Sequence, residues 1–349
     1  MLNTALKIKT FDRLNANESE YAALNAFTNR IRAEQWPEDP PVKLEQTVRN
    51  FRFIPPFRDL TMWLARQGNE IVARAQIMIM RTEDNQHLAD FHVDVLPELR
   101  RQGLAKQFLG FIAEVAQKEK RRLLITDTDS AIPAGEAAMN RLGGRMGIAS
   151  HTNQLDLARL DRNLIRSWQE RACERADDFE LGLWDGPYPE EELESIIKLI
   201  EVMNTEPHGE LEVEDWHLTP ERLRQEEEAR LKRKVERWAM YARDRKTGQF
   251  AGFTEVYWNP EQPENLQQAG TGVFPEYRSK GLGRWLKAAM IEHVLRDRPY
   301  VKRIRTGNAN SNAPMLKINH ELGFKPYKSW TTWQVDLDRV LEYLGMNPK

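Results

Sequence analysis

The alternation of apolar and polar positions follows one order of elements that occurs twice in this chain of 349 residues. Period-two stretches predict strands and period-3.6 stretches predict helices. In the first half the pattern predicts strands near residues 5–12, 63–66, 71–80, 89–95, 122–126 and 154–157, and helices near 18–35, 44–51, 103–120 and 135–142. In the second half it predicts strands near 179–184, 238–244, 250–258, 267–273, 301–306 and 330–336, and helices near 283–296 and 313–322. A duplicated domain is therefore expected.

The repeat divides the chain into an N-terminal domain at 1–159, a charged helical connector at 160–176 and a C-terminal domain at 177–349. Each half is long enough to bury its own core. The segment 221–237 is almost entirely charged, and its acidic and basic residues alternate. This pattern favours a solvated helix face over a nucleic-acid patch.

The most informative repeated segment is a basic, glycine-containing loop between a strand and a helix. Its second copy runs from Thr271 to Leu286 and its first from Val93 to Phe108. The start of a helix presents backbone N–H groups without intrahelical partners, and the helix dipole adds partial positive charge there. Such a loop is a place where anions bind.

Two common phosphate-binding motifs do not fit this loop. A P-loop needs G-x-x-x-x-G-K-[ST], but Gly281 and Gly283 lie too close together and no Lys-Ser/Thr follows. A dinucleotide fingerprint needs a third glycine, and Leu286 occupies that position.

The motif resembles that of the GNAT superfamily of acyl-CoA N-acetyltransferases. One part of the resemblance is Val273-x-Pro275-x-x-Arg278-x-x-Gly281-x-Gly283, and the other is the asparagine-led segment from Asn308 to Phe324. Tandem halves of this type are similar to bacterial double-domain acetyltransferases. The resemblance implies an α/β fold in which each half has a mixed, mostly antiparallel sheet flanked by helices.

The resemblance also implies acetyl-CoA as co-substrate. No metal is expected, because the chain has a single cysteine and no residue pair with a metal-ligand spacing. In the second half the expected acetyl-CoA-binding residues are Val273, Arg278, Ser279, Lys280, Gly281, Leu282, Gly283, Arg284 and Asn312. In the first half they are Val95, Arg100, Arg101, Gln102, Gly103, Leu104 and Ala105. Loop amides would hold the pyrophosphate, cations would pair with phosphate oxygens, and the free N–H of Val273 would polarise the thioester carbonyl.

Transfer to an amine requires a base, because an alkylammonium group has a pKa near 10. Glu255 and Tyr257 alternate onto one face of a predicted strand and are the candidates, with surface and core roles as the alternatives. Asn312 either caps its helix or contacts the pantetheine arm. The tyrosine acid that the family often places seven residues later is replaced by Asn319, and Ser311, Tyr327 or a water are the substitutes considered.

The first half departs from the second motif. Pro133 stands where Asn312 is expected, so catalysis is assigned to the second half, and the first half is expected to bind acetyl-CoA or to be structural. His92, Asp94 and Asp127 are residue types that could make the first half active, but core or capping roles are favoured.

Composition limits the partners. The net charge of −2 gives no basic field for nucleic acid, and no apolar run reaches the 18 or so residues that a membrane span requires. The single cysteine, Cys173, is expected to be a bystander thiol, and a cytoplasmic location follows from the lack of a signal-peptide layout. The acidic stretch 203–216 is interpreted as a substrate loop that suits a cationic small-molecule amine, or as a solvated loop.

Three functions are compatible with these patterns. The first is an acetyl-CoA-dependent N-acetyltransferase. The second is a non-catalytic acyl-CoA sensor or scaffold, which the missing tyrosine favours. The third, an aminoacyl transferase that uses charged tRNA, is disfavoured by the near-neutral charge. The acceptor amine and the oligomeric state are not determined by the sequence.

Overall fold

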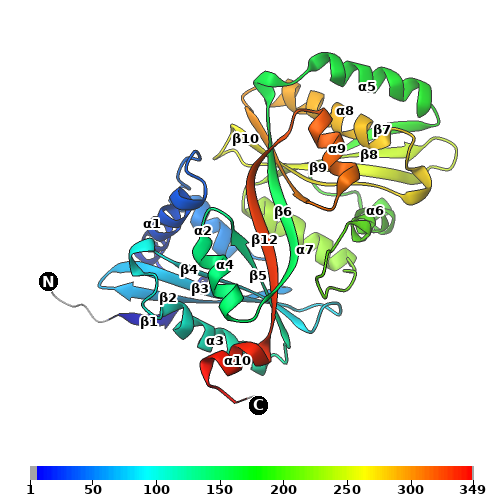
Figure 1. The fold of residues 1–349 in the computed structure, drawn as a ribbon. Helices are drawn as coiled ribbons and strands as arrows, with labels where there is room; N and C mark the ends of the chain where they lie inside the picture. The colour runs from blue at the N-terminus through cyan, green and yellow to red at the C-terminus, as the bar shows by residue number, and fades with distance from the viewer. Residues whose placement is uncertain (1–5, 348–349) are drawn as a thin grey trace. The chain divides into compact units, whose positions relative to one another are not determined.

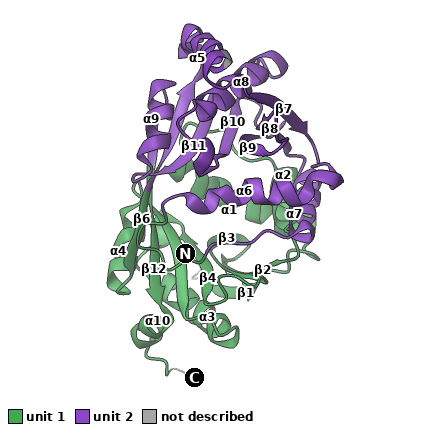
Figure 2. Cartoon of the chain, turned by 90° about the vertical axis from the view of Figure 1, so that its right-hand side faces the viewer, with its two compact units in different colours: residues 1–149, 208–214, 329–349 green, residues 150–207, 215–328 purple. Residues whose placement is uncertain are grey.

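A computed structural model describes residues 6–347, and these form two compact units that are not contiguous in sequence (Figures 1 and 2). Unit 1 consists of residues 1–149, 208–214 and 329–349, and unit 2 of residues 150–207 and 215–328. The sequence repeat and the compact units therefore do not share their boundaries. The side chain of Cys173 lies outside the described part of the chain.

Unit 1 is a six-stranded sheet with the strand order β1-β2-β3-β4-β5-β12. The strands are β1 (Lys7–Thr10), β2 (Arg58–Gln67), β3 (Glu70–Met80), β4 (Leu88–Val95), β5 (Leu123–Asp129) and β12 (Lys325–Asp336). The helices are α1 (Glu18–Gln35), α2 (Leu44–Arg52), α3 (Leu104–Lys118), α4 (Pro133–Arg141) and α10 (Leu337–Leu344). A capping box at Asn17 starts α1, and its buried residues Tyr21, Leu24, Phe27 and Ile31 face the sheet.

Unit 2 repeats this arrangement with the strand order β6-β11-β10-β9-β8-β7. The strands are β6 (Arg145–Asp156), β7 (Phe179–Asp185), β8 (Glu236–Asp244), β9 (Phe250–Trp258), β10 (Asn265–Val273) and β11 (Arg303–Ala309). The helices are α5 (Arg162–Arg175), α6 (Leu193–Glu201), α7 (Pro220–Lys232), α8 (Leu282–Asp297) and α9 (Ala313–Glu321). One hydrophobic cluster lies on the α5 and α8 side of the sheet, and a second on the α6 side.

In both units the sheet is mixed and mostly antiparallel, as expected. The one parallel pair is β4–β5 in unit 1 and β10–β11 in unit 2 among the described strands. The α/β architecture that the family resemblance implied is confirmed.

The last strand of each sequence repeat belongs to the other unit. Residues Ser150–Asp156 of β6 pair with β11 in unit 2, and residues Trp330–Asp336 of β12 pair with β5 in unit 1. Val335 is fully buried and Trp333 is 4% exposed in the core of unit 1, whereas Leu155 is 1% exposed in the core of unit 2.

The charged helix is not simply a solvated face, as the sequence pattern suggested. Glu227 and Arg230 of α7 are buried, with exposed fractions of 3% and 8%. Both are paired, because burying an unpaired charge is costly. The pattern predicted a solvated helix face but not the burial of Glu227 and Arg230, because alternating charges have the same sequence pattern whether they contact water or one another.

The exchange of strands gives a paired prediction. Trp333→Ala should destabilise unit 1 by about 3–5 kcal/mol and Leu155→Ala should destabilise unit 2 by about 2–5 kcal/mol, because each substitution leaves a cavity in that core. Amide hydrogen exchange in β2–β4 and in β8–β10 reports the two units separately. If Trp333→Ala increases amide hydrogen exchange in β8–β10 and leaves it unchanged in β2–β4, the assignment of β12 to unit 1 is contradicted.

Candidate active site

The strands of the parallel pair separate after three residues in each unit. In unit 2, β10 and β11 pair only from Asn265 to Gln267, after which β10 follows β9 and β11 follows β6. In unit 1, β4 and β5 pair only from Leu88 to Asp90. A wedge therefore opens between two adjacent strands of each sheet.

The glycine loop of unit 2 lies directly after this wedge. Ser279 and Gly281 have φ values of 67° and 89°, and Gly281 is the N-cap of α8. Among the described residues, no protein group accepts a hydrogen bond from the amides of residues 279–283. Consecutive unpaired N–H groups around left-handed residues form an anion-binding concavity.

The first copy has the same backbone. Arg101 and Gly103 have φ values of 64° and 84°. In the described chain, the amides of residues 101–105 likewise have no protein acceptor. A non-glycine residue in the left-handed region costs about 1–2 kcal/mol, so Arg101 and Ser279 mark backbone that is held in a strained form.

The arginine of each motif fastens the loop to the end of the preceding strand. Arg278 donates from Nε to the carbonyl of Val273 (3.0 Å) and from Nη2 to Thr205 (2.8 Å). Arg100 donates from Nε to the carbonyl of Val95 (3.0 Å), and its other nitrogens bind Glu34. These guanidinium groups therefore position the loop, and phosphate contact by them stays a prediction.

The other two predicted cations also have protein contacts. Arg284 forms two bonds of 2.8 Å with Glu321. The Lys280 ammonium lies 5.1 Å from the ring centre of Phe179 and 5.7 Å from that of Tyr277. The loop amides are thus the donors that the protein leaves unused.

The N–H of Val273 faces the wedge. The amide of Phe274 donates to Ala251 on β9 at 2.9 Å. Because successive amides of a strand point in opposite directions, the N–H of Val273 points away from β9, to the side of β11. In unit 1 the amide of Leu96 donates to the carbonyl of Val72 on β3 in the same way. The N–H of Val95 therefore points away from β3, to the side of β5.

Glu255 and Tyr257 lie together on the α6 and α7 side of β9. The Tyr257 hydroxyl donates to the Glu255 carboxylate at 3.1 Å. A β-bulge at residues 268–271 of β10 lies opposite Glu255, and Gln268 donates to its main-chain oxygen at 2.8 Å. Burial raises the pKa of Glu255 above its ordinary value and raises that of Tyr257 well above its own.

Two buried arginines act electrostatically on the Glu255 carboxylate, and sequence analysis missed both. Arg237 is 3% exposed and lies over the ring of Tyr188, 3.4 Å from its centre. It is 3.5 Å from Glu227, which also accepts from the amide of Tyr188 at 2.7 Å. Arg237 and Arg230 lower the pKa of Glu255, opposing the effect of burial.

Asn312 caps α9, because its side chain accepts from the amide of Met315 at 3.3 Å. Asn319, at the position of the expected tyrosine, is 1% exposed. It donates to Asn308 on β11 at 2.8 Å and accepts from the ammonium of Lys287 at 3.0 Å. Tyr327, considered as a substitute acid, lies against the guanidinium of Arg305.

Lys287 is a buried lysine on α8, with an exposed fraction of 2%. Desolvation lowers its pKa to about 7, and Glu206 partly opposes that effect. The signal that could have revealed it is a lone lysine in the apolar segment Trp285–Met290. Asn308 lies beyond Arg305, the last residue of β11 that pairs with β10, so this chain of polar groups leads to the wedge.

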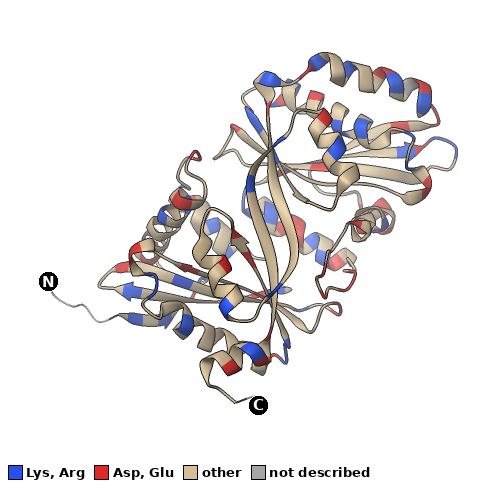
Figure 3. Cartoon of the chain, in the orientation of Figure 1, with Lys and Arg blue, Asp and Glu red and all other residues tan. Residues whose placement is uncertain are grey.

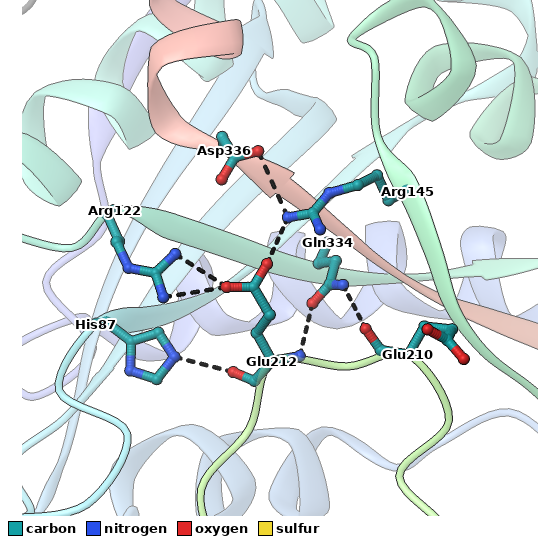
Figure 4. Close-up of polar contacts among 7 residues, drawn as sticks. All are labelled: His87, Arg122, Arg145, Glu210, Glu212, Gln334 and Asp336. Atoms are coloured by element: carbon teal, nitrogen blue, oxygen red, sulfur yellow. Dashed lines mark hydrogen bonds and ion pairs between the residues drawn. The ribbon is translucent and has the colours of Figure 1, made fainter.

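The acidic loop does not present all its carboxylates to a substrate. Residues 208–214 belong to unit 1, where Glu212 binds Arg122 at 3.1 Å and Arg145 at 2.7 Å (Figure 4). Gln334 accepts from the amide of Glu212 and donates to the carbonyl of Glu210. Glu212 was counted among the acids that suit a cationic amine, but it is neutralised by two arginines.

Charges of both signs are interspersed over both units (Figure 3). In the part of the chain that is described, no helix has the length and apolar character needed to cross a bilayer. Over the same residues, no group of three or more histidine, cysteine or acidic side chains is placed to hold a metal ion.

A model of the acetyltransferase (GNAT) family matches residues 28–139 and 196–324, one match for each copy of the loop. The chain therefore belongs to the GNAT acetyltransferase family, whose members are N-acyltransferases. No curated protein matches the sequence.

Among solved structures, the chain is similar to a tandem GNAT protein from the clavulanic acid biosynthesis pathway, solved without AcCoA. The identity is 25%, the TM-score 0.76, and the match covers 95% of this chain and 99% of that one. It is also similar to a GCN5-related N-acetyltransferase from Sphaerobacter thermophilus, at 12% identity and a TM-score of 0.67 over 95% and 96% of the two chains. This second likeness shows the fold alone, whereas the first supports the tandem arrangement.

The buried lysine predicts a pH-dependent stability. Because the folded-state pKa of Lys287 is about 7 and a free lysine titrates near 10.4, the unfolded state binds one more proton between these values. Wild-type unfolding free energy should therefore rise relative to that of Lys287→Met as pH increases from 7 to 10, by about 1.4 kcal/mol per unit at most. Denaturant titrations measure this difference.

Lys317→Met, at an exposed position of the neighbouring α9, is the matched control. If the two variants show the same pH dependence relative to wild type, Lys287 does not have a lowered pKa.

Proposed function

We propose that this protein transfers the acetyl group of acetyl-CoA to an amine of a small molecule by direct attack, with catalysis in unit 2. The supporting observation is the run of unpaired amides at residues 279–283, placed where β10 and β11 have separated. A diphosphate needs several converging N–H donors, and the wedge offers a path from this loop to the amide of Val273.

The cofactor-binding residues of unit 2 are Val273, Ser279, Lys280, Gly281, Leu282, Gly283 and Asn312, with Arg278 and Arg284 at the border of the loop. In unit 1, Val95 and residues 100–105 have the same backbone geometry. We therefore propose that both loops bind acetyl-CoA.

Glu255 is proposed as the base of unit 2. Its raised pKa makes it a better proton acceptor than an ordinary carboxylate, and the nearby arginines keep its charged form accessible. The base takes a proton from the ammonium group of the acceptor, the amine nitrogen attacks the thioester carbon, and the Val273 amide stabilises the developing oxyanion.

Lys287 is proposed as the general acid that protonates the departing thiolate, because Asn319, at the position of the expected tyrosine, cannot supply a proton. A thiolate with a pKa near 8.5 leaves more easily when a proton is supplied. An ordinary lysine is a weaker acid than a thiol, but a lysine with a pKa of about 7 is a stronger one. Glu255 lies on the α6 side of the sheet and Lys287 on the α8 side. The base would therefore reach the acceptor amine from one face of the sheet, and the acid would reach the thiolate from the other.

The rival is a non-catalytic acyl-CoA sensor, which the absence of the usual tyrosine favours. The position of Lys287 weakens that argument, since it places an ionisable donor beside Asn319. Binding of acetyl-CoA without CoA release for a broad panel of amines would support the sensor.

Binding at the loop is tested by Gly281→Ala. A residue with a side chain is strained at φ 89°, and a Cβ there would enter the open space before the amides. One acetyl-CoA binding event should weaken about tenfold or more in calorimetry. Gly248→Ala has similar strain (φ 72°) and similarly open surroundings in a hairpin, so it should leave binding unchanged. Equal losses in both variants would show that the loop is not the site.

The base is tested by Glu255→Gln in a His92→Gln background, so that CoA release from unit 2 alone is followed; its kcat should fall about 100-fold or more while acetyl-CoA affinity is kept. Tyr257→Phe removes a hydrogen bond that lowers the pKa of Glu255, so the acid limb of its pH–rate profile should move to higher pH. An unchanged kcat on adding Glu255→Gln in that background would remove Glu255 from the mechanism.

A further inference from the structure

Unit 1 has the loop and the wedge of unit 2, but its wedge carries different side chains. His92 and Asp94 lie on β4 beyond Asp90, the last residue that pairs with β5. Glycines occupy the corresponding positions Gly270 and Gly272 on β10 of unit 2. β4 thus carries ionisable side chains at two positions where β10 of unit 2 carries none.

His92 and Asp94 form an oriented pair. The Nε2 atom of His92 lies 2.9 Å from an oxygen of Asp94, whose side chain is 6% exposed. Arg74 donates to the other oxygen of Asp94 at 2.5 Å and lies over the rings of Phe27 and Phe51. With Nε2 facing the carboxylate, the second ring nitrogen is the proton acceptor.

The second nitrogen, Nδ1, has no hydrogen-bond partner among the described residues, and the His92 side chain is 35% exposed. A base whose other nitrogen is held by a buried carboxylate is the arrangement of a proton-accepting dyad. The role favoured from the sequence, in the core or as a cap, does not account for an unpaired Nδ1. Nor does it account for the buried Asp94 carboxylate, which contacts both His92 and Arg74.

Two accessible carboxylates lie beside this pair. Asp127, on β5, interacts electrostatically with both His92 and Asp90, and it accepts a hydrogen bond of 2.5 Å from Thr332 on β12. Desolvation and the charge of Asp127 raise the pKa of Asp90 to about 6. The charge of Asp127 disfavours ionisation of Asp90, and a cation bound beside Asp90 would favour its charged form.

We propose that unit 1 is a second acyl-transfer centre, in which His92, oriented by Asp94, is the base for a cationic primary amine held by Asp90 and Asp127. This inference rests on the proposed function for the use of acetyl-CoA. It adds a separate catalytic site with its own acceptor-binding groups, in the half of the chain whose second motif is degenerate.

The proposed step is balanced. Nδ1 of His92 takes one proton from the ammonium group, and the freed amine nitrogen forms a bond to the thioester carbon. The carbon–sulfur bond then breaks, the thiolate takes the second proton from nitrogen, and His92 returns its proton to solvent. An alkylammonium and acetyl-CoA thus give an acetamide, CoA and one proton.

The test begins in the Glu255→Gln protein, in which unit 2 is inactive by proposal. Free CoA release is measured with acetyl-CoA and a panel of primary alkylamines and diamines. Turnover should persist in Glu255→Gln. Adding His92→Gln to that protein should lower the remaining turnover about 100-fold or more. His320→Gln, an exposed histidine on α9, is the matched control and should change nothing.

Asp94 is a positioning residue, so its test is a pH profile. The groups that face His92 are Asp94, Arg74 and Asp127, and the first raises the pKa of His92 above its ordinary value. In Asp94→Asn the histidine NMR titration and the acid limb of the remaining turnover should both move to lower pH. A thermal melt of each variant separates this effect from unfolding.

The outcomes separate the two proposals. If the wild-type protein releases CoA and Glu255→Gln releases none, the second centre is overturned while the proposed function stands. If Glu255→Gln is active but His92→Gln leaves that activity unchanged, His92 is not the base and the inference is again overturned. If the wild type binds acetyl-CoA but releases no CoA with any amine, both proposals fall.

Discussion

The constraint on which the structure depends is that each parallel strand pair ends after three residues. Two strands can separate in a sheet only if each keeps a partner on its outer side, because an unpaired backbone would otherwise be buried. β10 has β9 and β11 has β6, while β4 has β3 and β5 has β12. The wedge, the direction of the Val273 amide and the place of the glycine loop all follow from this divergence.

The same desolvation acts in opposite directions on the two ionisable groups proposed for unit 2. Burial disfavours charge of either sign, so it raises the pKa of Glu255 and lowers that of Lys287. The pKa of Glu255 is thereby shifted upward and that of Lys287 downward, so each group exchanges a proton more readily near neutral pH. Tyr257 donates a hydrogen bond to Glu255, and Asn319 accepts one from Lys287.

Local features of the fold were predictable from the sequence, and non-local ones were not. The loop geometry followed from Gly103 and Gly281, since few other residues adopt positive φ without strain. The exchange of β6 and β12 could not be predicted, because a strand's pattern shows that it is half buried but not which sheet it joins. Lys287 was missed for a related reason: Asn319 was compared with a tyrosine, whereas its partner lies 32 positions away on another helix.

The place of β12 has a consequence for synthesis of the chain. Unit 1 needs the strand segment Trp330–Asp336 to cover the β5 edge of its sheet, and this segment is synthesised long after residues 7–129, which supply the other strands of that sheet. Until then β5 presents an open edge of backbone groups, which can pair with another nascent chain. Unit 1 therefore cannot complete its sheet until residues 330–336 have been synthesised, so it does not finish folding before the second half of the chain is made.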